Sequence, residues 1–232
     1  MSTLDLSTLD LSTLGLRTVN QMLNTLPANT PPADWTIDNP LGQHAIACGL
    51  NAPVNVTING HAGFYCAGMN QLATVTVNGH VGVGVAENMM SGTVHVNGNA
   101  SQSAGATGHG GLLVIEGDAS SRCGISMKGI DIVVGGSVGH MSAFMAQLGR
   151  LVVCGDAGEA LGDSIYEAEL YVQGKVESLG ADCEEKPMTP EHLAALKELL
   201  HKAGIQADAG KFRRYGSARR LYHFDVDQAD AY

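Results

Sequence analysis

The sequence predicts an all-β fold, a right-handed parallel β-helix built from coils of 19 residues. Three observations predict it: a glycine recurs every 19 residues, branched aliphatic residues stand two and four positions before each of these glycines, and mostly small residues stand two and three positions after it. The aliphatic pairs run from Val56 and Ile58 to Leu170 and Val172, and every member is Val, Ile or Leu. The turn glycines are Gly60, Gly79, Gly98, Gly117, Gly136, Gly155 and Gly174.

Such units must stack to be stable. Each offers one short strand whose alternating aliphatic side chains point to one face, but a single strand cannot bury that face or pair its own N–H and C=O groups. A neighbouring coil does both, and we expect the chain to turn at glycines that adopt positive φ. Because paired strands lie about 4.8 Å apart, seven coils make a rod of roughly 30 Å.

The period also excludes other repeat architectures. Nineteen residues are too few for a repeat that contains a helix, and propeller units are about 40 residues or longer. Left-handed hexapeptide coils need a multiple of six residues, so a 19-residue period favours right-handed coiling.

The amino-terminal segment, residues 1–34, precedes the repeats. It opens with a repeated pentad, Ser-Thr-Leu-Asp-Leu, which indicates a replicated start site or a duplicated strand whose early copies are disordered. Apolar residues at helical spacing then predict a short helix over residues 17–26, which Pro27 ends. We expect an irregular first coil from Trp35 to Cys48 to cap the solenoid, which spans residues 35–183.

The carboxy-terminal segment, residues 184–232, contains a second predicted helix and a basic, aromatic tail. Thr189 and Pro190 have the residue types of an N-cap and a first helical position, and Gly204 ends the helical pattern. Residues 211–224 then hold five of the chain's 13 Lys and Arg residues and four of its ten Phe and Tyr residues. Since Arg and Tyr side chains commonly anchor interfaces, we expect this tail to bind a partner. The expected interface residues are Arg213, Arg214, Tyr215, Arg219 and Tyr222.

Composition limits the class of protein. A formal net charge of −10 and a pI near 5.2 argue against binding to nucleic acid or to an anionic membrane. No apolar run approaches 18 residues and no signal peptide is evident, so we expect a cytoplasmic protein. The odd number of cysteines, without a CxxC pair, indicates free thiols rather than disulfides or a zinc or iron–sulfur site. The five cysteines are Cys48, Cys66, Cys123, Cys154 and Cys183.

Two sets of residues could suggest ligand binding. His61 and His80 occupy the same corner of adjacent coils, close enough to share a metal, with Asn99 and Asp118 next in line, but corner polar residues usually form a solvated ladder. The glycines at 82–84 and 108–111 lie in coil corners rather than between a strand and a helix, so they indicate turns rather than a phosphate-binding loop. No catalytic or cofactor-binding residue is predicted.

The glycine repeat, the segment from Leu11-Ser12 to Asn20-Gln21-Met22-Leu23 and the tail from Phe212 to Phe224 together resemble the GXGXG family. This β-helix forms the carboxy-terminal domain of the glutamate synthase large subunit and also one of the subunits of formylmethanofuran dehydrogenase. Stand-alone chains with a similar Phe-x-x-Tyr-Gly-Ser-Ala-Arg-x-Leu-Tyr tail look most like the small subunits of N-methylglutamate synthases. The resemblance covers nearly the whole chain.

The resemblance implies a non-catalytic structural subunit. Its expected partners are a glutamine amidotransferase-like subunit and an FMN-binding glutamate synthase-like subunit, with FMN and an iron–sulfur cluster in the partner. The implied reaction converts glutamate and methylamine to N-methylglutamate and ammonia. Whether the solenoid lines the route of ammonia or methylamine stays open.

Two alternatives remain. The chain resembles equally well, in fold, a subunit of a formylmethanofuran dehydrogenase-like one-carbon complex. The other alternative is an autonomous β-helix enzyme such as a polysaccharide lyase, which would need a groove lined by carboxylates and by basic or aromatic residues. Val, Ala, Gly, Ser and Thr dominate the coil faces instead, which disfavours this alternative.

Overall fold

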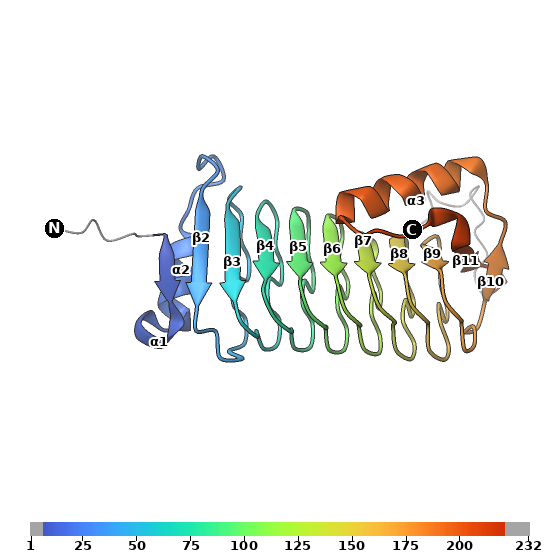
Figure 1. The fold of residues 1–232 in the computed structure, drawn as a ribbon, viewed down its shortest axis with the longest axis horizontal. Helices are drawn as coiled ribbons and strands as arrows, with labels where there is room; N and C mark the ends of the chain where they lie inside the picture. The colour runs from blue at the N-terminus through green and yellow to red at the C-terminus, as the bar shows by residue number, and fades with distance from the viewer. Residues whose placement is uncertain (1–6, 221–232) are drawn as a thin grey trace, which may run out of the picture.

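A computed structural model describes residues 7–220 and shows a parallel β-solenoid of 19-residue coils, as predicted (Figure 1). One 11-stranded sheet runs the length of the rod in the order β1-β2-β3-β4-β5-β6-β7-β8-β9-β11-β10, and β1 to β9 are parallel. A second line of parallel bridges joins the coils between Ala62 and Val176. The parallel strands are β1 Thr8–Asp10, β2 Asp34–Asp38, β3 Asn55–Asn59, β4 Thr74–Val77, β5 Thr93–Val96, β6 Leu112–Ile115, β7 Lys128–Val134, β8 Leu148–Val153 and β9 Glu169–Val172.

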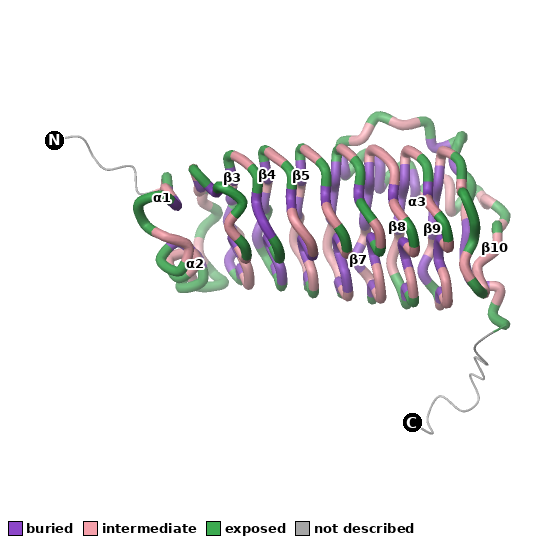
Figure 2. The backbone as a smooth tube through the Cα atoms, turned by 90° about the horizontal axis from the view of Figure 1, so that it is seen from below, coloured by how far each residue is buried: buried purple, intermediate pink, exposed green. Residues whose placement is uncertain are grey.

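The repeated aliphatic residues form the core. In register, Val56 lies beside Val75 and Val75 beside Val94, so like side chains stack on like. All fourteen predicted aliphatic positions are inward and at most 1% exposed. Figure 2 shows the same repetition, with buried segments recurring in successive coils.

The turn glycines have a different role from the one expected. Gly60 alone among the seven has a positive φ, of 133°, so the expectation that they turn the chain through left-handed geometry is wrong for the other six. They are needed because the coils approach closely: a Cβ on Gly79 would lie 2.6 Å from the carbonyl atoms of Gly60, and one on Gly98 would lie 2.6 Å from the carbonyl oxygen of Gly79.

Left-handed residues occur elsewhere in each coil. They stand five, seven and nine positions after the turn glycine, in an alternating pattern that carries the chain around the face opposite the strands. Most of them are not glycine, although positive φ costs an ordinary residue on the order of 1 kcal/mol. These residues are Tyr65, Ala67 and Met69; Gly84, Ala86 and Asn88; Ser103, Gly105 and Thr107; Arg122, Gly124 and Ser126; Met141, Ala143 and Met145; and Ala160, Gly162 and Ser164.

The amino-terminal segment caps the first coil. The second pentad supplies β1, and the first pentad lies outside the described residues. Two short helices follow, α1 Leu11–Leu14 and α2 Leu16–Asn24, so the predicted helix is present but ends two residues earlier than expected. The Asn20 amide donates to the Ala45 carbonyl at 2.7 Å and accepts from the Ala47 N–H at 2.9 Å, which fixes α2 on the first coil.

The carboxy-terminal segment adds β10 Cys183–Lys186, α3 Pro190–Ala203, the 3₁₀ turn Ala209–Lys211 and β11 Arg213–Ser217. Helix α3 has the predicted ends, because Thr189 caps its amino terminus and Gly204 follows it in the left-handed conformation. It lies along the outer face of the sheet near the carboxyl end of the rod (Figure 1).

The helix α3 creates a second core on that outer face. Leu196, Leu199 and Leu200 of α3 pack with the outward residues of β6 to β9. The residue three positions before the turn glycine changes accordingly along the solenoid, from polar in β3 to β5 to apolar beneath the helix. In order, this residue is Thr57, Thr76, His95, Val114, Val133, Val152 and Tyr171.

Candidate interaction site

The predicted interface tail begins as part of the sheet. Strand β11 lies between β9 and β10 and is antiparallel to both, with Arg214 opposite Tyr171 and Tyr215 opposite Leu170. Its position closes the carboxyl end of the solenoid. The backbone of residues 213–217 is therefore paired within its own chain.

The side chains of the predicted interface residues differ in what they contact. Tyr215 is 2% exposed and packs in the main core, where its hydroxyl group is buried without a hydrogen-bond partner among the described residues. The Arg213 guanidinium lies 5.8 Å from the centre of the Tyr215 ring and is about half exposed. Arg219 is 62% exposed and its Nη2 lies 2.7 Å from Glu167 Oε2. Tyr222 lies outside the described residues.

Glu169 of β9 connects this tail to α3. Its carboxylate accepts a hydrogen bond from the Tyr171 hydroxyl group at 2.8 Å and forms ion-pair contacts with His192 Nε2 at 3.1 Å and Arg214 Nη1 at 3.5 Å. Burial, followed by the hydrogen bond to Glu169, raises the pKa of Tyr171 above its usual value. The phenol therefore stays protonated and donates to Glu169 throughout the neutral range.

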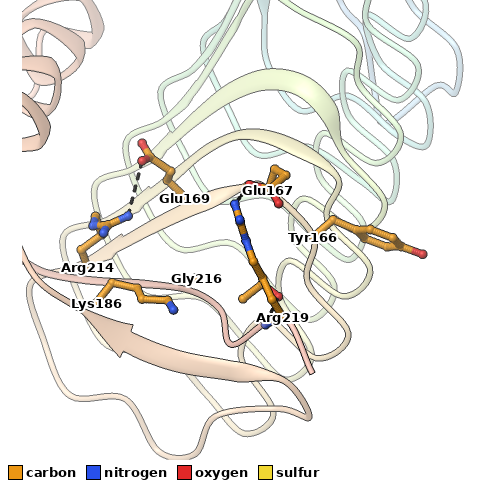
Figure 3. Close-up of a pocket in the computed structure, with 9 residues that line it drawn as sticks. Tyr166, Glu167, Glu169, Lys186, Arg214, Gly216 and Arg219 are labelled. Carbon is orange, nitrogen blue, oxygen red and sulfur yellow. Dashed lines mark hydrogen bonds and ion pairs between the residues drawn. The ribbon is translucent and has the colours of Figure 1, made fainter. Parts of the chain in front are cut away.

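A pocket of about 340 Å³ lies beside this cluster (Figure 3). Glu167 and Glu169 face it from one side and Lys186 and Arg214 from the other, while Arg219 reaches across to Glu167. Arginine and lysine hold carboxylates and other anions through charge-assisted hydrogen bonds. The pocket thus brings Arg214 and Arg219, two of the predicted interface residues, to one concave surface. Docking of the tail on a partner stays a prediction.

His61 and His80 are brought together, but by a hydrogen-bond ladder. Their rings stack at 4.9 Å between centroids, and His61 Nδ1 accepts the backbone N–H of His80 at 2.9 Å, as His80 Nδ1 accepts that of Asn99. Asn99 and Asp118 continue the ladder with side-chain oxygens that accept the next backbone N–H groups. Each Nδ1 lone pair is therefore occupied. Within residues 7–220, no three His, Cys, Asp or Glu side chains form a group able to hold a metal ion.

The cysteines are free thiols in the described structure. Burial raises the pKa of Cys123 and Cys183 to about 12 and that of Cys154 to about 11, and it also raises the pKa of Cys48 and Cys66. Since the thiolate is the nucleophile, these groups are poor nucleophiles at neutral pH.

Sequence reasoning missed the cluster around Glu169, because its members come from β9, β11 and α3. One signal existed. The change from Thr and His to Val and Tyr on the outer row of the sheet indicates that some apolar element covers β6 to β9, and the leucine stripe of residues 193–200 is its match.

Comparison with known proteins places the chain in a family. It is 60% identical over 199 residues to "Protein GlxC" of Rhizobium meliloti (strain 1021), a match that covers 85% of this chain and 87% of the relative. The chain belongs to the GlxC family. At this identity the two proteins share a fold, and a match of this length takes in most of the solenoid.

Two further comparisons add no relative to GlxC. No model of a known protein family matches the chain, and no solved structure matches it. None of the helices within residues 7–220 is both long and apolar enough to cross a membrane.

Proposed function

We propose that the chain is a non-catalytic structural subunit of a glutamate-synthase-like complex. In this proposal the solenoid holds a glutamine amidotransferase-like subunit and an FMN-binding glutamate synthase-like subunit at a fixed separation. The finer proposal is N-methylglutamate synthase, which forms N-methylglutamate and ammonia from glutamate and methylamine. The chemistry, the FMN and the iron–sulfur cluster belong to the partner subunits.

The observation that carries the scaffold proposal is the unbroken register of the coils. Strands β2 to β9 pair in parallel without a change of neighbour, and bridges between residues 62 and 176 repeat the pairing on a second line. Repeats that contact only their neighbours build elongated bodies whose length follows the number of repeats. A rod of this kind can set the distance between two bound proteins.

Side-chain ladders support the rigidity that this role needs. The Asn59 amide donates to Asp38, the Asn78 amide to Asn59 and the Asn97 amide to Asn78, at 2.7 to 2.9 Å. A second ladder runs through His61 and His80 on the neighbouring corner. Both ladders join coils that the backbone already pairs, so bending the rod would break several hydrogen bonds in each coil.

The choice of complex comes from the sequence resemblance of the tail and of the repeat, together with membership of the GlxC family. The test is to purify the full-length tagged chain from its native host and identify the proteins that remain bound through size exclusion. The proposal expects an amidotransferase-like subunit and a flavin-bearing subunit. Co-elution with formylmethanofuran dehydrogenase-like subunits instead would support the one-carbon alternative, and a monomeric chain without partners would contradict both.

A further inference from the structure

The charged residues of the chain are distributed very unevenly. Residues 39–115, a third of the sequence, contain a single Asp, Glu, Lys or Arg, which is Glu87, whereas the whole chain is 16% charged. Burial raises the pKa of this carboxyl group too, which favours its neutral form. The net charge of −10 is therefore carried by the two ends of the rod.

These residues form the coils that contain β3, β4 and β5, and we call them the uncharged girdle. The lack of charge extends around the whole circumference. The sheet face presents Thr57, Thr76 and His95, and the adjoining corner presents His61 and His80. The opposite face exposes large apolar side chains, at 46% for Phe64, 48% for Tyr65, 54% for Met69, 44% for Leu72 and 48% for Met90.

The girdle is also the part of the sheet that α3 leaves open. The apolar side chains of α3 pack on β6 to β9, and Thr57, Thr76 and His95 of β3 to β5 are not in that core (Figure 1). A solvent-facing coil has no reason to avoid Lys, Glu and Asp, which are common on protein surfaces. Depletion of charge together with exposed aromatic and methionine side chains is instead typical of the centre of a protein–protein interface.

We propose that the uncharged girdle, residues 39–115, is enclosed by a different protein subunit whose contacting surface is itself uncharged. Naming that subunit as one of the catalytic partners rests on the proposed function. A twofold contact with a second copy would cover one patch of the coils, whereas the charge-free surface surrounds them. Nucleic acid or an anionic membrane would require cations, of which the girdle has none apart from its histidines.

The chain contains an internal control for this proposal. Met69, Gln71 and Leu72 stand nine, eleven and twelve positions after Gly60, and Met145, Gln147 and Leu148 stand at the same positions after Gly136. Both methionines have positive φ, near 56° and 52°, and all six side chains are exposed. Only the second corner has charged neighbours in its own and the next coil, among them Arg150 and Glu167.

The first experiment is methionine oxidation by hydrogen peroxide, followed by mass spectrometry, on the complex purified from the native host and on the isolated chain. The thioether reacts only where the reagent reaches it. Met69 and Met90 should oxidise at least about fivefold more slowly in the complex, while Met145 changes by less than about twofold. Equal rates for Met69 and Met145 in the complex, or no recovered complex at all, would overturn the proposal.

The second experiment introduces a charge at matched positions, Gln71→Glu inside the girdle and Gln147→Glu outside it. Both glutamines are exposed, so both variants should keep the melting temperature of the wild type. The first should weaken association with the partner by about tenfold or more, because a charge would be buried at the interface, and the second by less than about twofold. Equal effects would overturn the proposal.

Mass measurement separates the occupants. Protection of Met69 in an assembly that contains only copies of the 24.1 kDa chain would overturn the hetero-subunit assignment. Protection by a partner that is neither amidotransferase-like nor flavin-bearing would leave the girdle as an interface and would contradict the proposed function. Binding of those two subunits with Met69 unprotected would do the reverse.

Discussion

His61 Nδ1 accepts the backbone N–H of His80 at 2.9 Å while the two rings stack 4.9 Å apart. The pair therefore acts as one step of the corner ladder, in which a side chain of one coil satisfies the backbone of the next. Asn99 makes the same hydrogen bond to Asp118 two coils further on.

The ladder predicts a specific pattern of substitutions at His61. His61→Phe keeps a ring for stacking but removes the acceptor, so the free energy of unfolding should fall by about 0.5 to 1.5 kcal/mol. His61→Asn restores an acceptor, as Asn99 does, and should lose less than half of that. Urea unfolding of the three proteins measures the difference. If the Asn variant is no better than the Phe variant, the hydrogen bond contributes nothing.

The core predicts a much larger effect at an inward position. Ile115 is fully buried, and its strand β6 lies between β5 and β7. Ile115→Asp would place an unpaired charge in the dry core and should cost several kcal/mol, enough to prevent folding at about 37 °C. Thr93→Asp, at an outward position of β5, is the control and should remain soluble with a nearly unchanged melting temperature. A folded Ile115→Asp protein would contradict the inward assignment.

The glycines allow steric crowding to be separated from backbone conformation. Gly79→Ala would force a methyl group against the Gly60 carbonyl group, which is backbone and cannot move aside, so a loss of about 1 to 3 kcal/mol is expected. Gly124→Ala is predicted to cost less than about 1 kcal/mol despite a φ of 70°, because Ala86 and Ala143 already occupy this position of their coils with positive φ. Thermal unfolding compares them, and the reverse order would show that φ dominates.

The buried thiols predict a loss of stability in alkaline solution. Burial raises the pKa of Cys123 from its ordinary value of 9 to about 12, so between these values the unfolded chain releases a proton that the folded chain retains. The free energy of unfolding should therefore fall as pH rises from about 9 towards about 12, by up to about 1.4 kcal/mol per pH unit for this thiol. Cys123→Ala should flatten the slope. An unchanged slope would mean that Cys123 does not contribute.

The tail predicts two different truncation results. Removal of residues 221–232 leaves β11 in place, so the folded protein should keep its melting temperature. Removal of residues 212–232 deletes β11 and the buried Tyr215 and should cost several kcal/mol. The role of the tail as an interface is therefore better tested by Arg213→Gln and Arg219→Gln, which keep the strand. Unchanged partner affinity in both variants would contradict the predicted tail interface.

The sequence was informative wherever the structure depends on local pattern or on the repeat. The 19-residue period predicted the coil, its register and the inward aliphatic residues, and Thr189 and Gly204 predicted both ends of α3. Contacts between distant segments were not predictable. Nothing local says that residues 213–217 pair with β9, or that Arg214 and His192 meet at Glu169, because each depends on how the chain folds back.

The left-handed positions show a different limit. Glycine usually marks positive φ, but this solenoid imposes it on Tyr65, Met69 and Arg122, which sequence reasoning treats as ordinary residues. The recurring turn glycines pointed to the right place in the coil for the wrong reason, since they relieve crowding between coils rather than bend the chain.

The central claim is that this chain is a scaffold required by catalytic subunits. Its most direct test is to co-express the amidotransferase-like and flavin-bearing subunits with and without the chain, and to measure N-methylglutamate formed from glutamate and methylamine. The account predicts product from the three-subunit assembly and a loss of at least about tenfold when the chain is omitted, with the FMN retained on its own subunit. Undiminished N-methylglutamate formation by the two partners alone would contradict it.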